Sequence, residues 1–256
     1  MNDSSASSKP QQPIVLLFDI DGTLLTAHGA GKRAMNLALK RVFGYDNAFD
    51  GLDFRGMTDA LIVELALAKW HDAVQPSQLD AVYSVYLEHL ERELRESEAA
   101  RATPGAGQLL DWLRRQSGPV AIGLGTGNIE PAATMKLRHV NLDTYFTFGG
   151  FGSDHRMRSE IIRIGAERGS ALLGRPRNEC QIIVIGDTFH DIDAALANGA
   201  RAIGVGTSGV SPEALLLRGA SFAFETLEAP LIRSALLGQA APEEEKFGDP
   251  GISPHD

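Results

Sequence analysis

The sequence predicts an α/β protein with a Rossmann-like, doubly wound parallel sheet and an inserted α-helical cap domain. Three observations support this prediction. Short apolar runs alternate with helical patterns, the first run ends in a glycine-containing turn with two carboxylates, and residues 27–100 contain helical patterns alone. Strands that alternate with helices form βαβ units, whose strands are parallel and whose crossovers are right-handed.

The predicted strands are apolar runs at residues 15–18, 120–124, 182–185 and 202–205. Continuous apolar runs of this kind are typical of strands that are buried on both faces. Helical patterns separate them at 107–116, 159–169 and 191–198. We therefore assign residues 13–26 and 101–237 to the Rossmann-like core.

The predicted cap domain spans residues 27–100, with helical patterns at 31–43, 59–69 and 78–97. In the last of these, Val82, Tyr86, Leu90 and Leu94 recur at helical spacing. The chain is expected to re-enter the core at a hinge over 103–105, where proline and glycine interrupt the helical pattern. An insert beside the ligand edge of a sheet is placed to act as a lid that excludes water.

Composition limits the partners that we expect. The chain has 256 residues and a formal net charge of −9, which argues against a nucleic acid or an anionic membrane as the main partner. Its one cysteine, Cys180, adjoins an apolar run, so we expect a buried thiol. No intramolecular disulfide can form and no secretory signal is recognisable, so we expect a cytoplasmic protein.

Both ends of the chain are expected to lie outside the folded part. Residues 1–12 are rich in Ser, Gln and Pro and read as a disordered lead-in. Residues 238–256 mix Pro, Gly and acidic residues and read as a flexible tail.

The end of the first predicted strand is the strongest functional signal. Asp19 and Asp21 follow the run 14–18, at the edge where open α/β sheets bind their ligands. Two carboxylates this close repel each other, and a hard divalent cation with oxygen ligands would offset that repulsion. The alternative is an ordinary surface turn, because Asp and Gly are common turn residues.

Polar residues follow other predicted strands as well. Thr126, Gly127 and Asn128 form a turn that suits oxyanion binding, although Thr and Asn are also good helix N-caps. Asp187 and Asp191 place a second acidic pair after the run 182–185, and Asp191 can also cap the following helix. Arg158 opens a helix, where a cation is unfavourable; this suggests a functional role, although a surface salt bridge would explain it nearly as well.

Taken together, residues 19–24, 124–128 and 186–191 resemble the first, second and fourth motifs of the haloacid dehalogenase superfamily. The similarity is greatest to its phosphoglycolate-phosphatase-like branch with a helical cap, and it covers nearly all of residues 13–225. One motif departs from the family pattern. The third motif usually supplies a lysine, and its counterpart here is Arg158, with Arg156 as a rival.

This resemblance implies a Mg²⁺-dependent phosphatase that acts on a small phosphorylated metabolite. Asp19 would be the nucleophile that forms an aspartyl-phosphate, and Asp21 the general acid and base. Magnesium would be held by Asp19, the main-chain carbonyl of Asp21 and Asp187, with Asp191 supporting the metal site.

The resemblance also implies where the substrate binds. The phosphoryl group would be bound by Thr126, Gly127, Asn128 and Arg158. Substrate selection would involve Arg55 and Thr58 in the cap loop 55–59, although Thr58 or Asp59 would serve equally well as a helix cap.

Three other functions remain open at this point. A sugar phosphomutase of the same superfamily would return the phosphoryl group to its substrate. A phosphonatase would use a cap lysine, for which Lys32 is conceivable but unsupported. A non-catalytic binding protein on this scaffold is the alternative from another class. The sequence does not indicate the oligomeric state.

Overall fold

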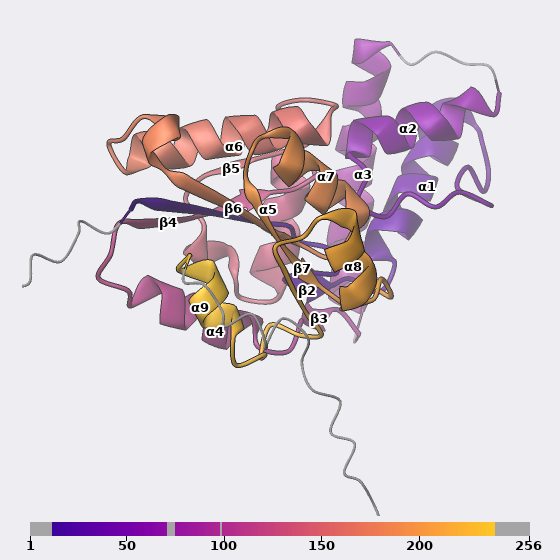
Figure 1. Ribbon diagram of the computed structural model, residues 1–256. Coiled ribbons are helices and arrows are strands. Elements are labelled where there is room, and N and C mark those ends of the chain that lie inside the picture. Colours follow the sequence, from indigo (N-terminus) through magenta and orange to yellow (C-terminus); the bar gives the residue numbers. More distant parts are fainter. Residues whose placement is uncertain (1–11, 71–74, 98, 239–256) are drawn as a thin grey trace, which may run out of the picture.

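A six-stranded parallel sheet forms the centre of the molecule, with strand order β5-β4-β1-β6-β7-β8 (Figure 1). The computed structural model describes residues 12–70, 75–97 and 99–238. The strands are β1 (Ile14–Phe18), β4 (Val120–Gly125), β5 (Gly149–Gly150), β6 (Gln181–Gly186), β7 (Arg201–Val205) and β8 (Phe222–Phe224). In register, Phe18 faces Leu124 on β4 and Ile185 on β6, so these three strands end at one edge.

Helices cover both faces of this sheet. Leu16 and Phe18 of β1 pack in a cluster with helices on one face, and Val15 and Leu17 pack in a second cluster on the other. The first set of helices is α4 (Ala106–Arg114), α5 (Glu130–His139) and α9 (Ile232–Leu236); the second is α6 (Arg158–Leu172), α7 (Phe189–Ala197) and α8 (Pro212–Arg218). Alternate residues of a strand point to opposite faces, which explains why the strands read as continuous apolar runs. The predicted doubly wound α/β class is confirmed.

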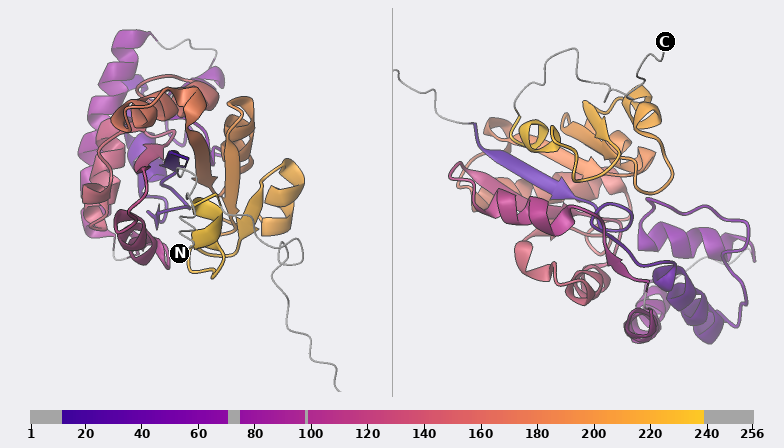
Figure 2. Two further views of the ribbon diagram at one scale, coloured as in Figure 1. Left: turned by 60° about the vertical axis from the view of Figure 1, so that its left-hand side comes forward. Right: turned by 90° about the horizontal axis from the view of Figure 1, so that it is seen from below.

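A helical segment is inserted between β1 and β4. It contains α1 (Ala30–Phe43), α2 (Asp59–Ala68) and α3 (Pro76–Glu96). Its two connections to the core pair as a short antiparallel sheet, β2 (Leu25–Thr26) with β3 (Arg101–Ala102). Figure 2 shows the segment lying to one side of the sheet, beyond the end of β1. α1 packs against α3, and Leu39, Tyr86 and Leu90 are buried there.

The sequence patterns did not indicate several short elements, including β2, β3, β5, β8, α5, α8 and α9. The 3-10 helices Asp143–Tyr145 and Arg177–Glu179 were also not predicted. The expected buried thiol of Cys180 is found just before β6. The predicted lead-in and tail lie outside the described residues, apart from Gln12 and Gly238. Within the described part of the chain, no helix has the length and apolar character needed to cross a membrane.

Candidate active site

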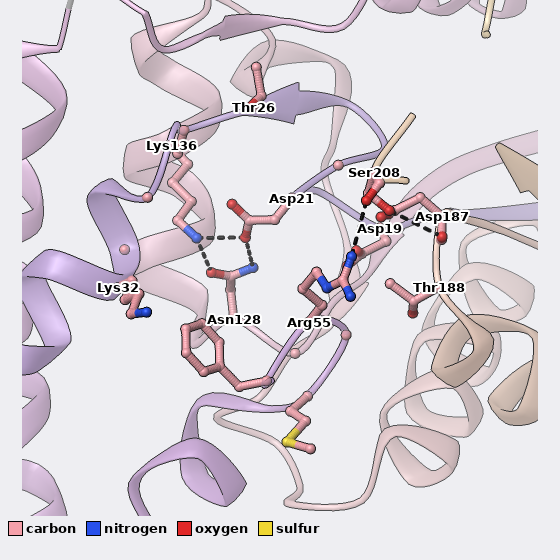
Figure 3. Close-up of a pocket in the computed structure, with 18 of the residues that line it drawn as sticks. Asp19, Asp21, Thr26, Lys32, Arg55, Asn128, Lys136, Asp187, Thr188 and Ser208 are labelled. Carbon is pink, nitrogen blue, oxygen red and sulfur yellow. Dashed lines mark hydrogen bonds and ion pairs between the residues drawn. The ribbon is translucent and has the colours of Figure 1, made fainter. Parts of the chain in front are cut away.

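The site lies where the ends of three neighbouring strands meet the helical segment. Asp19 follows β1, Asp187 follows β6, and the turn 126–128 follows β4. A cavity of about 620 Å³ opens between this sheet edge and α1–α3. Its walls include these predicted site residues: Asp19, Asp21, Arg55, Gly127, Asn128, Arg158 and Asp187 (Figure 3). Such a crevice at the carboxyl ends of parallel strands is where open α/β sheets bind ligands.

Three buried carboxylates lie close together, and two of them, Asp19 and Asp187, line the cavity. Oxygen atoms of Asp19, Asp187 and Asp191 lie within 4.8 Å of one another. One guanidinium, that of Arg158, balances them in part, with an Nη2 atom 2.7 Å from Asp19 Oδ1 and 2.5 Å from Asp191 Oδ1. The cluster therefore keeps an excess of negative charge in a place where water solvates it poorly.

Burial and the neighbouring carboxylates raise the pKa of Asp187 and of Asp19. Burial raises the pKa of Asp187 to about 8, and the carboxylates of Asp191 and Asp19 add to the rise. Burial also raises the pKa of Asp19 to about 6, although Arg158 opposes this. Carboxylates held in these surroundings fit a hard divalent cation, which takes oxygen ligands and would supply the missing positive charge. This donor set therefore fits magnesium.

Asp187 is held in a narrow space. Its Oδ1 accepts a 2.7 Å hydrogen bond from Thr23 Oγ1. Its Oδ2 lies so close to Gly22 that a Cβ on that residue would stand 2.3 Å away. Gly22 also has φ +87°, a left-handed conformation that favours glycine. The first motif thus needs its glycine both for the turn and for the close approach of Asp187.

Both carboxylate oxygens of Asp191 have hydrogen-bond donors from the protein as partners. Its Oδ2 accepts hydrogen bonds from Thr188 N at 3.0 Å and Thr188 Oγ1 at 2.7 Å, in the capping box that begins α7. Its Oδ1 is paired with Arg158. Both oxygens of Asp191 therefore fix neighbouring groups, which agrees with a supporting role.

The two candidate arginines lie in different places. Arg158 is buried, and besides its two ion pairs it donates to the main-chain carbonyl of Gly56 at 2.8 Å. Arg156 is paired with Glu64 at 2.8 Å and its side chain is half exposed. Only Arg158 of the two lines the cavity.

A lysine that the sequence analysis did not single out lies beside Asp21. Lys136 Nζ is 2.6 Å from Asp21 Oδ2 and 2.7 Å from Asn128 Oδ1. Figure 3 shows these three side chains pointing toward one another. A signal was present in the sequence, because Lys136 falls on the same helical face as Ala132, Ala133 and Leu137, where an apolar residue is expected.

Three residues predicted to contact the substrate have partners within the protein. Thr126 and Thr58 are fully buried and lie outside the cavity lining. Thr126 Oγ1 accepts from Asn128 Nδ2 at 2.9 Å, and Thr58 Oγ1 caps α2 by accepting from Leu61 N at 3.3 Å. Arg55 lines the cavity, and its guanidinium is 2.8 Å from Asp53 Oδ2. The two threonines therefore shape the loops that border the cavity rather than its surface.

Known structures share this fold. A hydrolase from Pseudomonas syringae has a TM-score of 0.64 at 20% identity, covering 90% of this chain and 100% of that one. A putative beta-phosphoglucomutase from Bacteroides vulgatus also has a TM-score of 0.64 at 20% identity, with 90% of each chain covered. A predicted phosphoglycolate phosphatase from Haemophilus somnus has a TM-score of 0.62 at 15% identity, covering 90% of this chain and 98% of that one.

Sequence comparison gives a further relative and a family. The tyrosine-protein kinase PtkA of Mycobacterium tuberculosis is 25% identical over 204 residues, or 78% of this chain. The chain spans 65% of the length of that relative. The family model for haloacid dehalogenase-like hydrolases matches residues 15–199, which include the strands β1, β4 and β6 and the loops that carry the site. The chain therefore belongs to the haloacid dehalogenase-like hydrolase family.

Proposed function

We propose that the protein is a Mg²⁺-dependent phosphatase that hydrolyses a small phosphomonoester through an aspartyl-phosphate on Asp19. The observation that supports this most directly is the position of Asp19. Its carboxylate is buried at the end of the central strand, faces the cavity and is 2.7 Å from Arg158. A carboxylate beside a guanidinium suits attack on a phosphoryl group, whose oxygens need positive partners.

Magnesium would be held by Asp19, Asp187 and the main-chain carbonyl of Asp21. When bound, it would neutralise the phosphoryl oxygens and shield Asp19 from the charge of its substrate. Asp191 supports this site by holding Arg158 and the turn at Thr188.

In the first step, a carboxylate oxygen of Asp19 forms a bond to phosphorus while the bond from phosphorus to the ester oxygen breaks. Asp21 gives its proton to that oxygen, so that the alcohol leaves neutral. The phosphoryl oxygens are bound by Arg158 and the main-chain amide of Gly127. Asn128 lines the cavity beside them, with its side-chain amide donating to Asp21 and Thr126. Thr126 holds Asn128 in place, because its Oγ1 accepts a hydrogen bond from Asn128 Nδ2.

In the second step, water attacks the phosphorus of the aspartyl-phosphate. Asp21, now ionised, takes the proton of that water, and the Asp19 carboxylate is regenerated as inorganic phosphate leaves. The side chain of Asp21 is 42% exposed, so water can reach it. A phosphomutase reaction would instead require that water be kept from the aspartyl-phosphate on Asp19 until the phosphoryl group has been transferred.

We further propose that residues 27–100 act as a cap over this site and that the enzyme works in the cytoplasm. The cavity has walls from both the sheet edge and the helical segment, and its volume of about 620 Å³ fits a small metabolite. Arg55 borders the cavity from the loop before α2 and is the cap residue we assign to substrate contact.

Release of inorganic phosphate from p-nitrophenyl phosphate tests this function. We expect turnover with Mg²⁺, its loss in EDTA, and its loss in Asp19→Asn with an unchanged fold. Asp193→Asn is the matched control, because Asp193 pairs with Arg218 at the surface of α7. Turnover by Asp19→Asn close to that of the unaltered enzyme would refute the nucleophile. Transfer of labelled phosphate to a sugar phosphate, without release, would identify a mutase instead.

A further inference from the structure

We propose that Lys136 is a positioning residue for Asp21, and that its ammonium fixes the carboxylate that exchanges protons with the leaving group. The inference rests on the proposed function, because it takes Asp21 as the general acid and base. The observation behind it is the set of contacts that Lys136, a buried lysine of α5, makes with Asp21 and Asn128, whereas the proposed function rests on the position of Asp19.

Lys136, Asp21 and Asn128 form a closed triangle of hydrogen bonds (Figure 3). Lys136 Nζ donates to Asp21 Oδ2 at 2.6 Å and to Asn128 Oδ1 at 2.7 Å. Asn128 Nδ2 donates to the same Asp21 Oδ2 at 2.8 Å. Asp21 Oδ1 takes no part in the triangle, which makes it the oxygen for proton exchange with the substrate.

The two partners of this ion pair differ in their exposure to solvent. The Asp21 side chain is 42% exposed, whereas the Lys136 side chain is 5% exposed. A carboxylate at the open wall of a cavity samples several rotamers unless something holds it. Lys136 is anchored on α5 between Ala132, Ala133 and Leu137, so it supplies a fixed point.

Burying an ammonium is unfavourable unless it is paired, so Lys136 requires compensation. Beyond Asp21, the buried carboxylate of Asp59 on α2 also acts on it electrostatically. The phenol of Tyr86 on α3 lies near Lys136, since a Cβ on Gly31 would be 3.4 Å from Lys136 Nζ and 3.7 Å from the Tyr86 hydroxyl oxygen. Lys136 is thus enclosed by acidic and polar groups, and Arg158 is the cation at Asp19. Lys136 also lines the cavity, but its ammonium contacts Asp21 and Asn128 rather than Asp19.

The dependence of the rate on the leaving group tests the proposal. An alkyl phosphate such as propyl phosphate needs a proton on its leaving oxygen, whereas p-nitrophenolate leaves without one. We expect Lys136→Met to lower kcat/KM about 100-fold for propyl phosphate and less than about 5-fold for p-nitrophenyl phosphate. kcat/KM is the right quantity because it reports steps only up to the release of the alcohol. Lys136→Arg should restore part of the loss, because it retains a charged donor.

Controls separate positioning from other roles. Lys40→Met removes an exposed lysine paired with Asp46 and should change neither value. Asp21→Asn should show the same dependence on the leaving group as Lys136→Met. If Lys136→Met does not fold, Lys136→Gln keeps a hydrogen-bond donor without the charge and is measured in its place.

Two outcomes would overturn the proposal. An equal loss for both esters in a folded Lys136 variant would mean that the residue only supports the structure. A weaker inhibition by inorganic phosphate, with a raised KM for both esters, would mean that Lys136 binds the phosphoryl group. Either result with an inactive Asp19→Asn leaves the phosphatase function intact, whereas an active Asp19→Asn refutes that function whatever Lys136 does.

Discussion

Arg158 is the residue on which the charge balance of the site depends. It is buried against Asp19 and Asp191, and removing it leaves both carboxylates without their cation. We expect Arg158→Ala to lower kcat/KM by about 100-fold or more, as for loss of one charge-stabilising donor. Loss of one partner of a buried ion pair should also lower the free energy of unfolding by about 3–5 kcal/mol. Enzyme assays and denaturant unfolding measure the two effects.

Arg156→Ala is the control for this prediction. Arg156 pairs with Glu64 and is half exposed, so its removal should change stability by no more than about 0.5 kcal/mol and leave the rate nearly unchanged. A larger loss of phosphate binding in Arg156→Ala than in Arg158→Ala would show that the third-motif cation has been assigned to the wrong residue.

The buried aspartates give a second prediction, for the metal-free protein. Burial raises the pKa of Asp187 to about 8 and that of Asp19 to about 6, above the usual 3.8. The native state therefore keeps protons that the unfolded state has already released. Their contribution to stability is fully present below about pH 4 and is lost as the pH rises through about 6 and then about 8.

Melting temperatures in EDTA between about pH 4 and about pH 8.5 measure this loss. The stability of the unaltered protein relative to Asp187→Asn should fall as the pH rises, because Asn does not titrate. Magnesium should raise the melting temperature more at the alkaline end, where the carboxylates are ionised. If the stability of the unaltered protein relative to Asp187→Asn rose with pH in EDTA, the predicted direction would be contradicted.

At the scale of elements, the turn between β4 and α5 lies directly against the loop before α2. A Cβ on Gly127 would stand 2.3 Å from the main-chain oxygen of Met57. Gly127→Ala should therefore push this loop away, lower the free energy of unfolding by about 1–3 kcal/mol and raise KM several-fold. Denaturant unfolding and substrate saturation measure the two effects.

Gly107→Ala is the matched control. A Cβ on Gly107 in α4 would meet nothing within 4 Å apart from its chain neighbours and the nearby backbone of its own helix. This substitution should stabilise the protein by about 0.5–1 kcal/mol and leave KM unchanged. An unaltered KM in Gly127→Ala would mean that the close contact has no part in substrate binding.

The elements that sequence predicts well are those that carry their own pattern. β1 and β6 are continuous apolar runs, and α3 has apolar residues at helical spacing. β5 consists of two glycines and has no apolar signal, since its strand geometry comes from pairing with β4. α5 was also missed. Lys136 takes one of its four buried positions, where it pairs with Asp21.

The candidate site shows the same division. The aspartates after β1 and β6 could be found from sequence, because strand ends that lie side by side in a parallel sheet bring their loops together. The contact of Lys136 with Asp21 could not, because the two residues are far apart in sequence and meet only through the packing of α5. The same holds for Thr58, whose hydroxyl donates to the main chain of Arg156 across the boundary with the core.

At the scale of the whole molecule, the helical segment is tied to the core at the site itself. Asp59 N donates to Gly127 O at 2.9 Å, and Asp59 Oδ2 accepts from Ile129 N at 2.9 Å. Arg158 reaches the same loop through Gly56 O at 2.8 Å. The turn after β4, to which we assign phosphoryl binding, is therefore also the attachment of the helical segment. We expect the position of that segment to be coupled to the state of the site.

Asp59→Ala tests this coupling. The substitution removes the acceptor of the buried Ile129 N–H, and an unpaired buried donor destabilises by about 1–3 kcal/mol. We expect faster amide hydrogen exchange in α2 and in the β2–β3 connections, with exchange in the central sheet unchanged, and a raised KM. Asp46→Ala, which removes an exposed partner of Lys40 in the same segment, should leave both unaltered. Unchanged exchange in α2 would show that the segment is held by its packing alone; faster exchange with an unaltered KM would show that its attachment and substrate binding are independent.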